Sequence, residues 1–142
     1  MLPALDWLTP VLAGAEQQFG RRPSLFGYGQ GAMLAYGISA QRGYLVDHVV
    51  AVSGWLPPPL WPIAADNQSV QFPSIVGVHA HAEGDAAVPI SFAIDTLEAF
   101  ELAGADVDFI VVDEAGPHML GADPDGIGGV WAAARGVIES WT

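Results

Sequence analysis

The sequence predicts an α/β fold: a mostly parallel sheet of about four strands with helices on both faces. Short apolar runs alternate along the chain with longer segments of helical periodicity. The run at 49–52 is apolar without interruption, as expected of a parallel strand that is buried on both faces. The length of 142 residues, 51% of them hydrophobic, suits one domain with a real core. We therefore expect residues 1–142 to form a single domain.

The first expected element is a helix over 8–19. Thr9 is a plausible N-cap, Pro10 stands where a first-turn proline is tolerated, and Gly20 is a natural stop. The apolar residues that recur at helical spacing in this segment are Val11, Leu12, Ala15 and Phe19.

The remaining elements follow from the same patterns. Strands are expected at 24–28, 46–53, 74–80 and 107–112. Helices are expected at 30 to about 40, 89–103 and 127–141. The segment 54–73 is too rich in proline for helix or sheet, so we expect a long ordered loop whose Trp55, Leu56 and Trp61 are available to line a pocket. Packing of the loop itself is the simpler explanation of Trp55 and Trp61, and it is compatible with a role in a pocket.

Charge excludes several kinds of partner. The net charge is −12, the chain has no lysine, and its arginines are Arg21, Arg22, Arg42 and Arg135. Such a surface repels phosphate backbones and anionic membranes, so we expect no nucleic-acid partner. The acidity is most simply a solvating surface, as in a salty environment.

No apolar run is long enough for a membrane span. No basic residue stands ahead of an apolar region at the N-terminus, so we expect no signal peptide and a cytoplasmic location. Whether further residues precede these in the natural protein stays open.

Three glycines mark one turn of the chain, at Gly27, Gly29 and Gly31. An apolar run leads into this turn and a helical pattern leaves it, which is the layout of a G-x-S-x-G nucleophile elbow with Gly29 in place of the serine. An elbow holds its middle residue in a strained backbone conformation, which glycine adopts at least cost. An ordinary strand–turn–helix junction is the alternative.

An acid and a histidine follow the last two expected strands, at Asp85 and His118. The order of elbow, acid and histidine is that of the catalytic triad in α/β-hydrolases. Four segments also resemble motifs of one branch of that superfamily, the phospholipase/carboxylesterase family that includes acyl-protein thioesterases. The segments are 27–32 for G-F-S-Q-G-G, 52–57 for L-S-G-W-L-P, 81–89 for H-G-x-x-D-x-V-V-P, and 116–118, one residue short, for G-x-x-H.

The resemblance implies a site at the carboxyl ends of the strands. Position 29 would hold the nucleophile, Asp85 would orient His118, His118 would be the general base, and the backbone N–H of Gln30 would help to form the oxyanion hole. It implies hydrolysis of carboxylic esters or thioesters without a cofactor. The substrate would be a small ester or apolar ligand.

Two departures from the family pattern limit that expectation. Gly29 offers no hydroxyl, and the early strands of the family fold, with the loop that supplies the other oxyanion donor, are absent. We therefore expect a degenerate triad and an inactive or impaired hydrolase, which leaves open whether the chain is an enzyme. The alternatives are a non-catalytic relative that binds a ligand or partner, an enzyme in which His118 and Asp85 activate water, and an active-site variant or fragment.

Other interpretations of single residues also stay open. Asp85 is a possible helix cap and His118 a possible loop histidine. His79 and His81 alternate onto one strand face near Glu83, but their spacing alone is poor support for a metal site, and we expect none. Without the family's first half, the strand at 24–28 becomes an uncharged sheet edge. We therefore expect a homodimer or a complementing chain. The alternative is that the helix at 8–19 folds over this edge.

Overall fold

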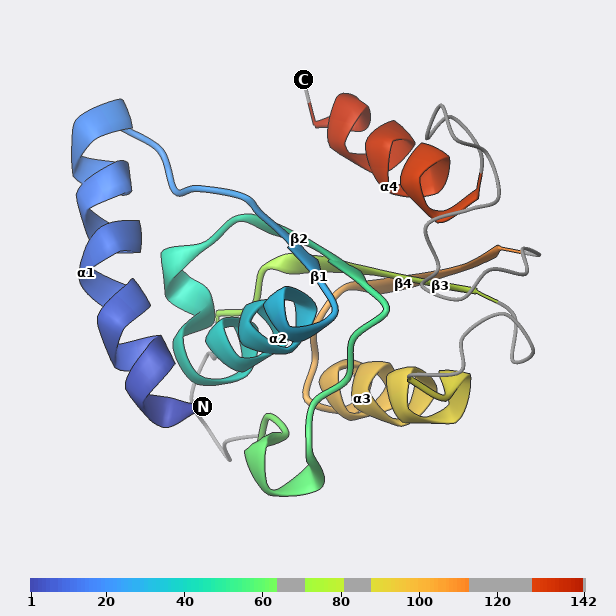
Figure 1. Ribbon diagram of the computed structural model, residues 1–142. Helices are drawn as coiled ribbons and strands as arrows, with labels where there is room; N and C mark the ends of the chain where they lie inside the picture. The colour runs from blue at the N-terminus through green and yellow to red at the C-terminus, as the bar shows by residue number, and fades with distance from the viewer. Residues whose placement is uncertain (64–70, 81–87, 113–128, 142) are drawn as a thin grey trace.

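Four parallel strands form one sheet in the computed structural model, which describes residues 1–63, 71–80, 88–112 and 129–141. The strands are β1 (Leu25–Tyr28), β2 (His48–Val52), β3 (Ser74–Ala80) and β4 (Val107–Val112). They lie side by side in chain order, and every neighbouring pair is parallel (Figure 1). This arrangement confirms the predicted fold class.

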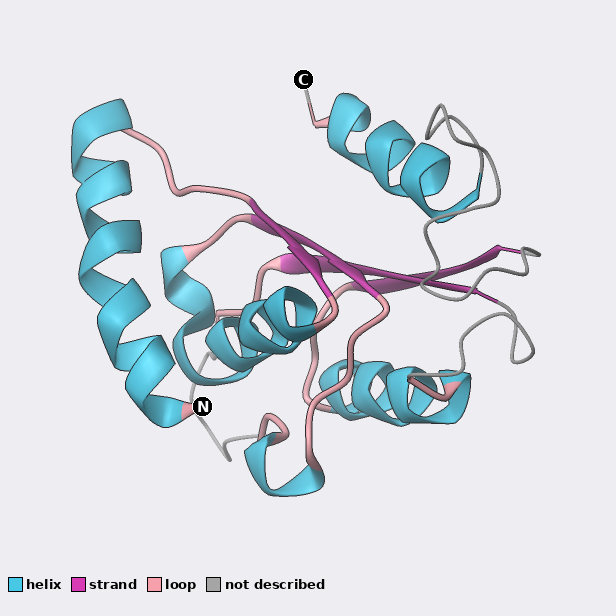
Figure 2. Ribbon diagram, viewed as in Figure 1, coloured by secondary structure: helices cyan, strands magenta, loops and turns pink. Residues whose placement is uncertain are grey.

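Helices cover both faces of the sheet (Figure 2). The helices α2 (Gln30–Arg42) and α3 (Ile90–Leu102) pack on one face, and α4 (Gly129–Ser140) packs on the other. The first helix, α1 (Leu2–Phe19), packs mainly against α2 and the short 3-10 turn η1 (Gly43–Leu45). A second 3-10 turn, η2 (Pro58–Leu60), lies within the proline-rich loop. We had expected no helix in this segment, so the short turn corrects that prediction. Among the described residues, no helix is both long and apolar enough to cross a membrane.

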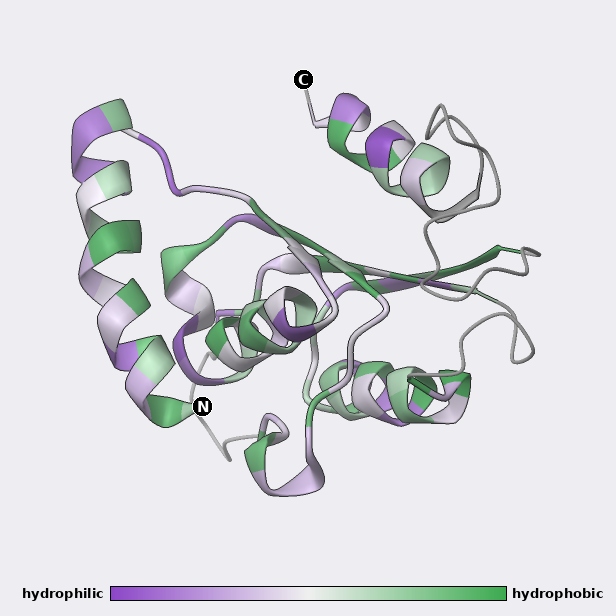
Figure 3. Cartoon of the chain, in the orientation of Figure 1, coloured by the Kyte–Doolittle hydropathy of each residue, from purple (hydrophilic) through white to green (hydrophobic). Residues whose placement is uncertain are grey.

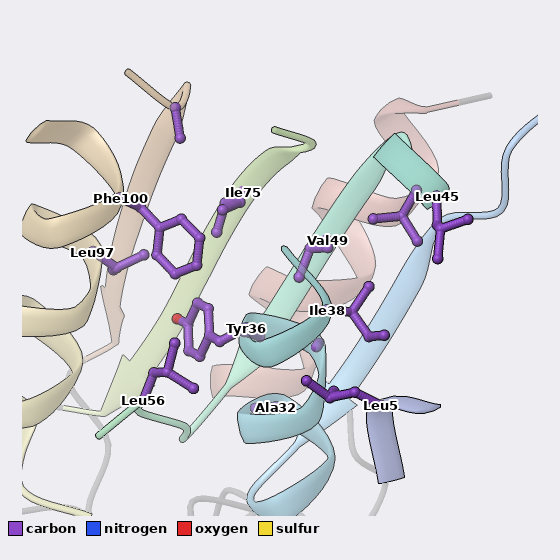
Figure 4. Packing of buried hydrophobic residues seen from close by; sticks show 14 of the residues in the cluster. Leu5, Ala32, Tyr36, Ile38, Leu45, Val49, Leu56, Ile75, Leu97 and Phe100 are labelled. Atoms are coloured by element: carbon purple, nitrogen blue, oxygen red, sulfur yellow. The ribbon is translucent and has the colours of Figure 1, made fainter. Parts of the chain in front are cut away.

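The larger core lies between the sheet and the helices α1, α2 and α3 (Figure 4). The ring of Tyr36 from α2 lies 5.9 Å from that of Phe100 on α3, and both side chains are buried. Leu5 of α1 is fully buried against the same cluster, which ties the first helix to the domain. Ala32, Ala35 and Ile38 of α2 are buried as well.

The smaller core lies between the sheet and α4. Val50, Val52 and Val78 pack there against the buried Ala134. The Trp131 ring of the same helix lies 5.5 Å from the ring of Phe26 and 5.8 Å from that of Tyr28, both on β1.

The start of α1 corrects the sequence analysis. The helix begins at Leu2, with a proline in its first turn, so Thr9 is not its N-cap. The Thr9 hydroxyl instead donates to the carbonyl of Leu5 at 2.8 Å, one helical turn back. Pro10 lies inside the helix. Burial of Leu5 explains why the earlier turns are helical despite Pro10, since tertiary packing commonly overrides local propensity.

Candidate functional site

The glycine-rich turn joins β1 to α2. Tyr28 is the last residue of β1, and Gln30 is the first of α2. Gly29 between them has φ 56° and ψ −116°, a backbone conformation that favours glycine, as expected for the middle residue of an elbow. Its N–H donates to the carbonyl of Val52 on β2 at 2.9 Å, and its carbonyl accepts the N–H of Met33 at 3.1 Å. The turn is thus held by the sheet on one side and by the helix on the other.

Two of the turn's glycines are required for different reasons. A Cβ atom at Gly27 would lie 2.4 Å from the carbonyl oxygen of Gly31 and 2.7 Å from the backbone nitrogen of Ala32. Gly27 therefore allows the strand and the helix to approach closely. A Cβ atom at Gly29 would meet no described atom within 4 Å, although the positive φ would strain it. The space for a side chain at position 29 is open, and the backbone has the geometry of an elbow.

The N-terminus of α2 presents unused backbone donors at this turn. Gln30 begins the helix, so its N–H has no acceptor inside the helix. The first turn of α2 contains no acidic side chain that would neutralise the partial positive charge of a helix N-terminus. This environment favours a developing negative charge near Gly29, as an oxyanion hole requires.

Ser53 and His79 continue the same edge of the sheet. Tyr28 pairs with Val52, and Val52 pairs with Val78, so the next positions along the three strands are Gly29, Ser53 and His79. Ser53 is the one non-glycine residue with positive φ in the described part of the chain, at 54°. Both Ser53 and His79 are buried, and His79 Nε2 lies 2.8 Å from the Val88 carbonyl oxygen. Sequence analysis placed Ser53 in the segment 52–57 that resembles a family motif, but it gave this residue no role at the site.

The predicted acid and base lie outside the described residues. Asp85 and His118, with His81 and Glu83, belong to the ranges 81–87 and 113–128. Their predicted roles therefore stay predictions. Within the described ranges, no group of three or more histidine and acidic side chains could hold a metal ion.

The three predicted pocket residues lie in different surroundings. The ring of Trp55 lies 5.0 Å from that of Phe92 in the first turn of α3. Leu56 is fully buried in the larger core, and its N–H donates to Thr96 Oγ1 at 2.9 Å. Trp61 Nε1 donates to the carbonyl of Leu56 at 2.7 Å, which fixes the loop. These contacts hold the described residues around 55–61 in place, and a substrate role for the three residues stays a prediction.

Trp61 also lines a cavity of about 300 Å³ with Asp95, Glu98 and Leu102 of α3. These α3 residues lie in the part of the helix that leads toward the start of β4. Because β4 is parallel to β1, that end of the sheet is opposite to the carboxyl edge that carries Gly29. The Trp61 cavity is therefore separate from the elbow.

Comparison with protein families gives a match over most of the chain. The profile of the family described as phospholipase/carboxylesterase matches residues 18–122. That range includes the elbow and both predicted triad partners. A comparison with curated protein sequences found no match.

Solved structures share the fold at low sequence identity. Esterase PE8 is 22% identical with a TM-score of 0.66, and the match covers 95% of this chain and 61% of that one. SOBER1 of Arabidopsis thaliana is 18% identical with a TM-score of 0.68, covering 99% of this chain and 61% of that one. The carboxylesterase of Bacillus cereus is 15% identical with a TM-score of 0.63, covering 96% and 59%. The present chain thus spans about three fifths of the length of these structures.

Proposed function

Because the chain belongs to the phospholipase/carboxylesterase family, we propose that it is a serine-hydrolase relative whose inherited reaction is hydrolysis of carboxylic esters or thioesters. We further propose that Gly29 leaves this chain inactive or impaired in that reaction. The observation that carries the proposal is the backbone of Gly29, with φ 56° and ψ −116° at a strand-to-helix turn. The elbow is present, and the hydroxyl is not.

The inherited mechanism needs a side-chain oxygen at position 29. In that mechanism the hydroxyl adds to the carbonyl carbon of the ester while its proton passes to the histidine base, here proposed as His118 oriented by Asp85. The carbonyl oxygen becomes negative and would be stabilised by the N–H of Gln30. Gly29 cannot form the acyl-enzyme, so only residual catalysis by the remaining groups is expected.

A second candidate function is binding without catalysis. It is favoured by the large apolar side chains that the described surface exposes, among them Trp7 at 70% and Phe19 at 67%. A hydrolase relative without a nucleophile retains a folded sheet on which a partner can be bound. If this candidate is right, the wild-type chain does not hydrolyse an ester while a partner is bound.

Turnover of p-nitrophenyl butyrate tests the proposal. The wild-type chain should hydrolyse the ester no faster than a matched Gly29→Ala variant. Gly29→Ser should exceed both if the oxyanion hole is otherwise supplied, because the space at position 29 is open among the described residues. Wild-type turnover that Gly29→Ala leaves unchanged and His118→Ala abolishes would instead assign the chain a water-activating mechanism, against the proposal.

A further inference from the structure

A groove of about 500 Å³ lies at the end of the sheet opposite to the elbow. Its walls come from the last turns of α1 and α4 and from the residues that lead into β1 and β2 (Figure 1). Ser24 lines the groove, and the whole of β1 separates it from Gly29. Five steps along an extended strand span about 16 Å. The groove is therefore separate from any reaction at the elbow.

The groove combines apolar and cationic side chains. Phe19 of α1, Ile138 of α4 and the adjacent Trp141 supply apolar surface. Arg21 and Arg22 supply positive charge. Figure 3 shows the same contrast, because the segment between α1 and β1 is hydrophilic and hydrophobic bands recur in α4. Such a lining fits a small ligand that has an apolar body and a polar head.

Arg21 carries a positive charge that has no acidic partner among the described residues. The chain's other arginines form ion pairs, which join Arg22 to Asp47, Arg42 to Asp6 and Arg135 to Glu139. Acidic residues outnumber arginines by 16 to four in this chain, so an arginine without an acid stands out. Asp47 also lines the groove, but it is held by Arg22 at 2.7 Å. The charge of Arg21 is therefore uncompensated there.

His48 adds a polar group without a partner to the same wall. Its Nδ1 is buried and has no hydrogen-bond partner among the described residues, and its ring lies 5.0 Å from that of Trp141. A buried polar atom without a hydrogen bond is unfavourable, and such atoms are rare in folded proteins. Nδ1 is covered as the ring stands, but the torsion about Cβ–Cγ is broad in histidine. A small rotation would bring this nitrogen to a ligand oxygen.

The charges of the groove indicate the polar head of the ligand. One uncompensated guanidinium matches one negative charge, and its planar set of N–H donors can pair with both oxygens of a carboxylate. A doubly charged phosphate would also face Asp47 and the net charge of −12, which repel a second negative charge. A monocarboxylate is therefore the better fit.

We propose that this groove binds a small monocarboxylate that carries an alkyl or aryl body. The carboxylate lies against Arg21 and accepts a hydrogen bond from His48, and the body packs between Phe19 and Trp141. This site goes beyond the proposed function. It does not depend on esterase activity at the elbow, so the failure of either proposal would leave the other standing.

The probe is 4-phenylbutyrate, and its uncharged amide is the control ligand. Two-dimensional NMR of the ¹⁵N-labelled wild-type chain follows both titrations. The carboxylate should shift the Arg21 Nε–H and Trp141 Nε1–H signals, with a dissociation constant of about 1 mM for a ligand of this size. The amide should bind at least about tenfold more weakly, because it cannot form the ion pair with the guanidinium.

Three results of these titrations would overturn the proposal. The first is equal binding of the carboxylate and the amide, which would show that charge does not select the ligand. The second is the absence of a shift at both side-chain signals up to about 20 mM carboxylate. The third is a set of shifts confined to the turn at 27–31, which would place the carboxylate at the other end of the sheet.

Matched variants assign the binding to one arginine. Arg21→Gln and Arg135→Gln lose the same charge, but only Arg21 lines the groove. Both arginines are exposed, so both variants should fold, which circular dichroism checks. Arg21→Gln should weaken binding of 4-phenylbutyrate at least about tenfold, whereas Arg135→Gln should leave it within about twofold. Equal weakening by the two substitutions would show attraction to positive charge anywhere on the chain and would overturn the proposal.

Discussion

Substitution of Gly27 by alanine should force β1 and α2 apart at the elbow and lower the free energy of unfolding. The added Cβ would lie 2.4 Å from the oxygen and 2.6 Å from the carbon of the Gly31 carbonyl, whereas ordinary contacts begin at 3.4 Å. The shortfall is therefore about 1 Å, and the atoms that are struck belong to the backbone of α2 and cannot rotate away. Overpacking of this kind costs typically about 1–3 kcal/mol, and we expect Gly27→Ala to lie near about 3 kcal/mol.

Gly29→Ala is the matched control for this prediction. Its Cβ meets no described atom within 4 Å, so only the positive φ of 56° penalises it. Such a backbone conformation costs a non-glycine residue about 1–2 kcal/mol. Urea unfolding followed by tryptophan fluorescence gives the free energy of unfolding of all three proteins. A Gly27→Ala protein as stable as the wild type, or less affected than Gly29→Ala, would refute the close approach of β1 and α2.

Three further predictions concern the rest of the domain. Burial raises the pKa of the Tyr36 hydroxyl above its ordinary 10.0, so the unfolded chain loses this proton first. The free energy of unfolding should therefore fall as the pH rises past about 10, and Tyr36→Phe should remove that part of the fall in urea midpoints. The net charge of −12 should make the free energy of unfolding rise with KCl between about 0.1 M and 1 M, as screening lengths shorten from about 10 Å to 3 Å; a midpoint that ignores salt would contradict this. Leu5→Ala should cost about 2–5 kcal/mol because Leu5 is fully buried, whereas Val11→Ala, half exposed, should stay within about 0.5 kcal/mol; similar losses for both would contradict the placement of α1.

The strands were predictable because each is a short apolar run, and the structure pairs them in chain order. The strand predicted at 46–53 is only a few residues longer than β2 (His48–Val52). It was easy to recognise because Val49 and its neighbours, which are buried, form an uninterrupted apolar run. The turn at Gly29 was also predictable, because glycine spacing in a strand-to-helix turn reflects backbone conformation, which local sequence largely sets.

Features that depend on distant contacts were not predictable. The sequence analysis placed Val11 and Phe19 on an apolar helix stripe, but both are exposed, because helical spacing alone does not say which apolar stripe meets a partner. The true start of α1 depends on the burial of Leu5 among residues far along the chain. The positive φ of Ser53 has no local signal that separates it from an ordinary strand end. Asp85 and His118 lie outside the described residues, so their geometry stays a prediction.

Reaction of the wild-type chain with a fluorophosphonate, followed by intact mass and peptide mapping, tests most directly whether this elbow lacks its nucleophile. The reagent bonds covalently to an activated serine hydroxyl, and Gly29 has none. We predict no adduct on the folded chain and none on the peptide that carries the turn at 27–31. A stoichiometric adduct on the wild-type protein, mapped to any serine, would show that the nucleophile lies elsewhere and would contradict the central claim.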